Sequence, residues 1–241
     1  MDALILRFDA PLMSFGGVMV DQHGPTDRFP GLAMLTGLLA NALGYRHGEF
    51  DRLQQLQVRT QYAARWDVEP EHIVDYHTVD LGQEKMRYPG WTTHGGAEHR
   101  AGGPGAKFGT HQRYRHYWAN GVMTLAVALD GEGAPNLDGL EIALRRPARP
   151  LFLGRKTCLP AAPVLLARVQ AANVLDALCG YPAHPRIAEN DEETLAACWP
   201  ANIPGGMHAH TVSCYDQREW QNQIHAGRRE CNEGRIERPA S

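Results

Sequence analysis

The chain has 241 residues and a formal net charge of −3 at pH 7, with 43% hydrophobic and 21% charged residues. This length permits one substantial core, so we expect a single domain over 1–241 with an inserted arm rather than two full domains. The mild negative charge excludes a uniformly basic nucleic-acid coat protein. The five cysteines are scattered and never spaced C-x-x-C, which argues against a disulfide framework or a structural zinc site and fits a cytoplasmic location.

The N-terminal residues predict a strand and then a helix. Apolar residues at alternate positions over 3–9 favour a strand, and the charges among them argue against a secretory leader. After Pro30, leucines recur at helical intervals over 32–43, and Gly44 is placed to end that helix. This apolar stretch is too short to cross a bilayer, so we expect no membrane insertion.

Three further segments are interpreted as strands. Residues 58–66 alternate, with Arg59 and Arg65 on a cationic outer face. The apolar run 122–129 suits a central strand, and residues 140–144 alternate again. At least four strands with one strong helix between the first two predict an α+β fold with a ferredoxin-like, RRM-type sheet.

A glycine-rich arm interrupts this pattern, and the chain ends in polar residues. The arm is predicted over 79–112, and its surroundings up to Trp118 interleave aromatic and basic side chains. Single-stranded nucleic acid needs this mixture, because cations follow phosphates while flat rings stack on unpaired bases. The arm lacks the Gly-Lys-Ser/Thr of a P-loop. Residues 225–241 read as a polar C-terminal tail with little to bury.

Basic residues concentrate in two windows that contain no acid. One lies between Glu98 and Asp130, and the other lies between Glu141 and Asp176. The second contains RPLFLGRKTCLPAAP, residues 149–163, in which three large apolar residues are followed within one glycine by Arg155 and Lys156. Two such windows with glycines and aromatic residues indicate a site for a polyanion.

Catalytic motifs have little support in the sequence. His208 and His210 could share a strand face, but two ligands do not make a metal site. Ser14 does not lie in a G-x-S-x-G nucleophile elbow. Metal-free RNA cleavage stays open as an alternative, since it needs only a base and an acid. The residues that could supply them are Tyr76, His77, Lys107 and His111.

The segment 149–163 resembles the LGR(K/R)(S/T)C-proline signature of the CasD (Cas-five-type) family, a RAMP-superfamily subunit of the type I-E CRISPR surveillance complex Cascade. Further stretches are similar to that family in order and spacing. They are LRFDAPLMSFG (6–16), DRFPGLAMLTGLLANALG (27–44), DYHTV (75–79), QRYRHYWANGVMTLAVAL (112–129) and REW (218–220). The resemblance therefore spans positions 4 to about 220.

The resemblance implies a modified ferredoxin-like palm with a thumb inserted after DYHTV. Such subunits hold the 5′ handle of the CRISPR RNA without cutting it, cap the CasC backbone, adjoin the large subunit CasA and meet target DNA indirectly through the complex. No cofactor is implied. Related subunits of another subtype do cut RNA, so the endoribonuclease alternative stays open.

A hypothesis for the RNA contacts follows from this resemblance. Residues 151–153 anchor the segment, Gly154 brings the backbone against a phosphate, and Arg155 contributes more than Lys156. A helix N-terminus attracts phosphate, so the start of the first helix borders the RNA. The complete set of expected RNA-binding residues is Ser14, Phe15, Arg28, Lys107, Arg113, Arg115, Arg149, Gly154, Arg155 and Lys156.

Overall fold

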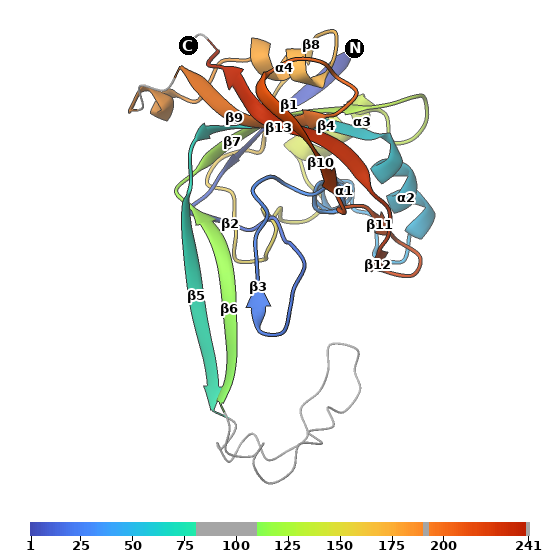
Figure 1. Ribbon diagram of the computed structural model, residues 1–241. Coiled ribbons are helices and arrows are strands. Elements are labelled where there is room, and N and C mark those ends of the chain that lie inside the picture. The colour runs from blue at the N-terminus through green and yellow to red at the C-terminus, as the bar shows by residue number, and fades with distance from the viewer. Residues whose placement is uncertain (81–109, 190–192, 240–241) are drawn as a thin grey trace.

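A seven-stranded antiparallel sheet forms the centre of the computed structural model, which describes residues 1–80, 110–189 and 193–239 (Figure 1). The strand order is β10-β13-β9-β4-β7-β1-β8. In that order the strands span Met207–Cys214, Arg229–Glu237, Thr194–Pro200, Thr60–Val68, Val122–Leu129, Asp2–Asp9 and Leu165–Gln170. The expected strands at 3–9 and 122–129 are confirmed as β1 and β7, which pair directly.

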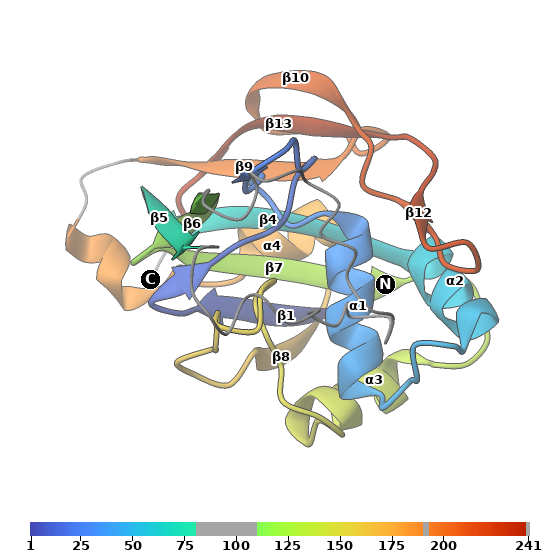
Figure 2. The same ribbon diagram turned by 90° about the horizontal axis from the view of Figure 1, so that it is seen from below.

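Helices cover both faces of this sheet (Figure 2). Successive side chains of a strand point to opposite faces, so β1 sends Leu4 and Leu6 toward α1–α3 and sends Ala3 and Ile5 toward α4. The helices are α1 (Leu32–Ala42), α2 (Phe50–Arg59), α3 (Leu137–Arg145), α4 (Val174–Gly180) and the 3-10 helix η3 (Pro185–Glu189). No helix in the described ranges is long and apolar enough to cross a membrane.

Helix α1 confirms the leucine periodicity in the sequence. It starts after the N-cap Gly31 and is followed by Gly44, whose φ of 78° is the left-handed conformation that ends a helix. A distant carboxylate caps its N-terminus, because the backbone N–H of Leu32 donates to Oδ2 of Asp216 at 2.8 Å. Asp216 is itself paired with Arg229 at 2.6 Å.

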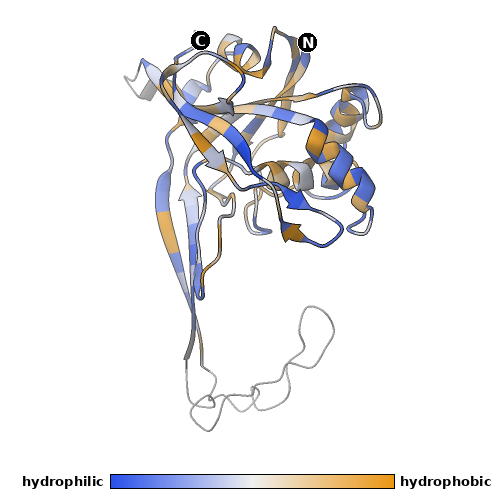
Figure 3. Cartoon of the chain, turned by 45° about the vertical axis from the view of Figure 1, so that its right-hand side comes forward, coloured by the Kyte–Doolittle hydropathy of each residue, from blue (hydrophilic) through white to orange (hydrophobic). Residues whose placement is uncertain are grey.

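A two-stranded hairpin extends away from the sheet (Figure 1). Its strands are β5 (Glu71–Asp80) and β6 (Thr110–Ala119), and β6 also pairs with β2 (Leu12–Met13) and β3 (His23–Gly24). We call these four strands the hairpin sheet. The residues of the expected arm from 81 to 109 lie outside the described residues. Colouring by hydropathy shows a mostly hydrophilic hairpin with one hydrophobic stretch in β5 (Figure 3).

The prediction of a strand at 140–144 is wrong, because these residues lie in helix α3. Leu140 and Leu144 are buried one helical turn apart, while Ile142 between them is 68% exposed. Asn136 caps the helix by accepting a hydrogen bond from the N–H of Gly139 at 2.9 Å.

The expected cationic outer face of residues 58–66 is also wrong. Val58 belongs to helix α2, and Arg65 is fully buried beneath helix α4. Its guanidinium donates to Oδ1 of Asp67 at 2.6 Å and to the carbonyl oxygen of Tyr181 at 2.9 Å. A buried cation needs such partners, and here they connect the sheet to the chain beyond α4.

The polar tail expected over 225–241 is corrected as well. Residues Arg229–Glu237 form β13, which pairs with β10 on one side and β9 on the other. Cys231 and Ile236 are buried there. Most other side chains of β13 are partly exposed, so the strand shows no clear alternation in the sequence.

Candidate nucleic-acid interface

The segment 149–163 forms a tight turn at the root of the hairpin. Leu151 and Leu153 are buried and anchor it, while Phe152 is half-buried. The N–H of Leu153 donates to the carbonyl of Cys158 at 2.8 Å, which closes the turn around residues 154–157. The carbonyl of Leu153 accepts the N–H of Ser14 at 3.1 Å, so the turn is joined to the loop after β1.

Gly154 is required by a contact within the protein. Its φ is 100°, and a Cβ there would lie 1.5 Å from the carbonyl oxygen of Ser14. No side chain fits in that space. The close approach that was expected toward a phosphate is therefore made toward the backbone of Ser14.

Arg155 joins the turn to two strands of the hairpin sheet. Its Nη1 donates to the carbonyl of His116 at 3.0 Å, and its Nη2 donates to the carbonyl of Gly24 at 2.8 Å. The guanidinium also lies over the ring of Tyr117, 4.7 Å from the centroid. Arg155 thus holds the hairpin root through its own donors, whereas the neighbouring Lys156 is exposed.

The side chains of Ser14 and Phe15 do not face solvent. Ser14 is 1% exposed and its hydroxyl donates to the carbonyl of His116 at 3.3 Å. Phe15 is 3% exposed and packs between the rings of Phe8 and Trp66. Both side chains support the hairpin root from inside the protein, and the expectation that the loop carrying them borders the RNA stays a prediction.

The start of helix α1 is already occupied by a carboxylate. Asp216 accepts the N–H of Leu32, so the N-terminus that was expected to attract phosphate has an internal anion. Arg28 nearby is paired with Glu69 at 2.9 Å and keeps a half-exposed side chain. This end of α1 therefore offers less to a polyanion than its sequence indicates.

Two of the remaining expected cations lie on the hairpin. Arg113 and Arg115 alternate along β6, and Arg115 is opposite Gly24 in the register of β3. Since Arg155 donates to the carbonyl of Gly24, the strand position of Arg115 lies next to the one that the Arg155 guanidinium contacts. Lys107 lies outside the described residues.

Arg149 lies apart from this group. Its Nε donates to Oδ1 of Asn41 at 2.8 Å, and its guanidinium also donates to the carbonyl of Tyr45. It thus binds the C-terminal end of α1, which is the opposite end from the one near Arg28. Arg155 contacts the strand opposite Arg115, and Lys156 follows Arg155 in the turn, whereas Arg149 lies elsewhere.

Histidines that the sequence analysis did not select gather on one face of the hairpin sheet. Nε2 of His72 lies 3.0 Å from Nδ1 of His116, and the rings of His23 and His116 are 6.4 Å apart. Desolvation lowers the pKa of His116, and His72 and His23 lower it further, so its neutral form is favoured. Only the strand register could have revealed this cluster, because its members are far apart in sequence.

The four residues of the endoribonuclease alternative do not form one constellation in the described part of the chain. Tyr76 and His77 are successive residues of β5 and therefore point to opposite faces. His77 contacts Asp75, with Nε2 and Oδ2 at 2.5 Å. Lys107 and the side chain of His111 lie outside the described residues. Within the described ranges, no group of three or more His, Cys, Asp or Glu residues is placed to hold a metal ion.

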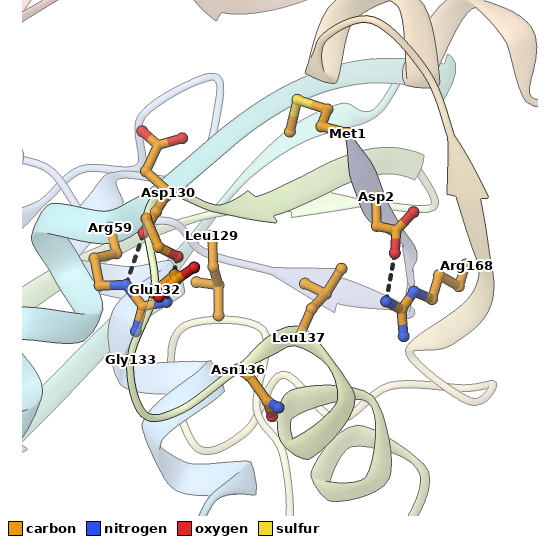
Figure 4. A pocket seen from close by; sticks show the side chains of 11 residues that line it. Met1, Asp2, Arg59, Leu129, Asp130, Glu132, Gly133, Asn136, Leu137 and Arg168 are labelled. Atoms are coloured by element: carbon orange, nitrogen blue, oxygen red, sulfur yellow. Dashed lines mark hydrogen bonds and ion pairs between the residues drawn. The ribbon is translucent and has the colours of Figure 1, made fainter.

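A separate open pocket of about 640 Å³ lies where β1 begins and β7 ends (Figure 4). Both arginines that line the pocket are bound to other groups of the protein. Arg59 donates to the carbonyl of Asp130 at 2.7 Å, and Arg168 is paired with Asp2 at 2.5 Å, which lowers the pKa of that carboxyl group. Asp130 and Glu132 also line the pocket, so it does not favour a polyanion.

Comparison with known proteins places the chain in a family. Residues 3–232 match the family described as CRISPR-associated protein (Cas_Cas5). The chain is 30% identical over 186 residues to "CRISPR system Cascade subunit CasD" of Escherichia coli (strain K12), which covers 74% of this chain and 76% of that protein.

Two solved structures share the fold. One, described as "CRISPR RNA-guided surveillance complex", has a TM-score of 0.72 at 23% identity and covers 99% of this chain and 91% of that one. The other, described as "Crystal structure of Cas protein", has a TM-score of 0.66 at 24% identity and covers 99% of this chain and 98% of that one. The family match over nearly the whole chain and the identity to CasD lead to one conclusion: this chain belongs to the Cas5 family of CRISPR-associated proteins and is a subunit of the Cas5/CasD type.

Proposed function

We propose that this chain is a non-catalytic RNA-binding subunit of a Cascade-type complex and that it holds the 5′ handle of the CRISPR RNA. The observation that carries the proposal is the junction of the 149–163 turn with the hairpin root. Arg155 and Gly154 fix that junction through contacts within the protein, and the exposed Lys156 and Arg115 lie beside it. Cations on a rigid backbone contact phosphates in a defined register.

We infer that the palm is a modified ferredoxin-like sheet. The order β4-β7-β1-β8, with α1 between β1 and β4 and α3 between β7 and β8, supports this inference. Strands β9, β13 and β10 extend the sheet beyond β4. The hairpin then corresponds to the root of a thumb inserted between β4 and β7.

We further propose that the subunit caps a CasC backbone, adjoins a CasA large subunit and meets target DNA through the assembled complex in the cytoplasm. The E. coli relative is described as a Cascade subunit, which supports an assembly of this kind. Val18, Met19 and Val20 form an exposed apolar loop next to β3, with exposed fractions of 61–79%. Exposed apolar segments of this kind are typical of protein contacts.

The test is one binding reaction analysed in two ways. The purified chain and labelled CRISPR-repeat RNA are mixed in EDTA and divided between a native gel and a denaturing gel. We expect a shifted, intact RNA. The double variant Lys156→Ala/Arg115→Ala should weaken the shift, whereas Arg146→Ala, which changes an exposed cation at the end of α3, should leave it unchanged.

Two results would contradict the proposal. If the wild-type chain shifts no RNA, it is not an RNA-binding subunit. If a discrete cut appears in EDTA and is abolished in His77→Ala, the chain is a metal-independent endoribonuclease instead.

A further inference from the structure

Three rings stack across the hairpin sheet, one from each of three strands. Tyr76 of β5 is opposite Tyr114 of β6, and Tyr114 is opposite His23 of β3. The Tyr76 and Tyr114 centroids are 5.0 Å apart at an interplanar angle of 29°, and those of Tyr114 and His23 are 4.8 Å apart at 8°. Tyr114 is therefore the middle ring of a three-ring ladder.

The outer end of this ladder at Tyr76 is open. Tyr76 is 50% exposed, and among the described residues β5 pairs with β6 alone, so no described strand lies beyond Tyr76. One face of the Tyr76 ring contacts Tyr114, and the opposite face lies toward solvent. A half-exposed, flat apolar surface at the end of a stack is a position where another flat ring binds favourably.

The ladder is held rigidly toward the hairpin root. His116 follows His23 at 6.4 Å between centroids, and His72 and Trp118 continue the row at 5.0 and 5.2 Å. The indole Nε1 of Trp118 donates to the carbonyl of Asp27 at 2.7 Å, which fixes the row to the loop before α1. A preorganised row loses little conformational freedom when it binds a ligand.

Charge nearby indicates what kind of flat ring binds there. Arg113 and Arg115 come directly before and after Tyr114 in β6, so their side chains lie on the opposite face of the strand from the ladder. Rings and cations on adjacent residues of one strand suit a ligand that carries both bases and phosphates. Stacking on a tyrosine face requires an unpaired base, because a paired base is already stacked within a duplex.

We propose that the open face of Tyr76 binds an unpaired nucleobase of single-stranded RNA, which extends the Tyr76–Tyr114–His23 ladder by one ring. This inference rests on the proposed function, because it requires that the chain binds RNA. It adds a base contact to an interface otherwise described by phosphate contacts. The base contact is independent of sequence, since every base has a flat face.

The test compares two variants with two probes. Tyr76→Leu removes the ring and keeps an apolar side chain, while Tyr76→Phe keeps the ring and removes the hydroxyl. Val79→Ala is the matched control, because Val79 is 45% exposed on the other face of the same strand. The probes are single-stranded CRISPR-repeat RNA and a strand of the same length whose sugars carry no bases.

We expect Tyr76→Leu to bind the repeat RNA about 5- to 140-fold more weakly than wild type. Tyr76→Phe and Val79→Ala should bind as wild type does. The strand without bases should bind wild type and Tyr76→Leu equally, since only phosphate contacts remain. A 2-aminopurine placed in the RNA should be quenched by wild type and Tyr76→Phe at one position at least, and not by Tyr76→Leu.

The outcomes separate this inference from the proposed function. If wild type binds neither probe, the RNA-binding function itself is wrong. If wild type binds the repeat RNA but Tyr76→Leu binds it equally well, the chain is an RNA-binding subunit and the stacking site is wrong. An equal loss for both probes in Tyr76→Leu also overturns stacking, because the effect would not depend on bases.

Discussion

Replacing Arg155 by alanine should destabilise the fold more than its place in a basic motif indicates. The substitution removes the donor to the carbonyl of Gly24, leaves the carbonyl of His116 with the Ser14 hydroxyl as its side-chain donor, and removes the contact with the Tyr117 ring. A hydrogen bond from a charged donor contributes roughly 1.5–3 kcal/mol, and the partial burial of Arg155 favours the low end of that range. With about 0.5 kcal/mol for the ring contact, the free energy of unfolding should fall by about 3.5 kcal/mol.

Thermal unfolding followed by circular dichroism measures this loss. For a chain of this length 1 kcal/mol corresponds to about 2–4 °C, so Tm should fall by about 7–14 °C. Lys156→Ala is the control, because its exposed side chain should change Tm by no more than about 2 °C while RNA affinity falls. If Arg155→Ala keeps the wild-type Tm and only its RNA affinity falls, Arg155 is a phosphate ligand and the structural role described for it is wrong.

Three further predictions test the support and the charge of the interface. Gly154→Ala should prevent native packing of the turn, since its Cβ would overlap the Ser14 carbonyl. The control Gly131→Ala also has a positive φ, 66°, but has open space around it, so it should lower the free energy of unfolding in urea by only about 1 kcal/mol. Equal losses in the two variants would contradict this reasoning. Arg65→Met should lower the free energy of unfolding by about 3–5 kcal/mol, because it removes one partner of the buried Arg65–Asp67 ion pair. Asp67 also lies 3.5 Å from Arg7, so a loss below about 1 kcal/mol would show that Arg7 is sufficient to compensate Asp67. The triple variant Arg113→Ala/Arg115→Ala/Lys156→Ala should reduce the log–log salt dependence of RNA binding by about 0.7 for each phosphate that is no longer neutralised, and an unchanged slope would remove these cations from the interface.

Periodicity predicted the elements whose burial follows one simple pattern. Helix α1 and strand β1 were identified because their apolar residues recur at helical or strand intervals, and β7 because its apolar residues form one nearly continuous run. In α3 the same approach failed, since Leu140 and Leu144 fit either period and the exposed Ile142 imitates a strand. The Asn136 cap was the local signal that favoured a helix. Strand β13 has mixed charges and only two deeply buried side chains, so its identity depends on its neighbours β10 and β9.

The candidate site likewise contains residues that the sequence predicts and residues that only the structure identifies. The sequence located the turn of residues 149–163 and the exposed Lys156, because basic residues after an apolar anchor are visible locally. It could not separate Lys156 from Arg155, since the acceptors of Arg155 are carbonyl oxygens of Gly24 and His116, which are distant in sequence. The ladder of Tyr76, Tyr114 and His23 needed the register of three strands, which no pattern in one segment provides.

The hairpin acts mechanically as a cantilever clamped at one end. Ser14 and Arg155 donate to the carbonyl of His116, which is opposite Val74, so about six residues of β5, or about 20 Å, lie beyond these contacts. A tilt of about 10° at that point would displace the end of β5 by about 3.5 Å, which is most of the spacing between neighbouring strands. The hydrogen bond of Trp118 lies further toward the sheet. Small changes in these three contacts are thus amplified along the lever arm, and residues far from any ligand determine where its tip reaches.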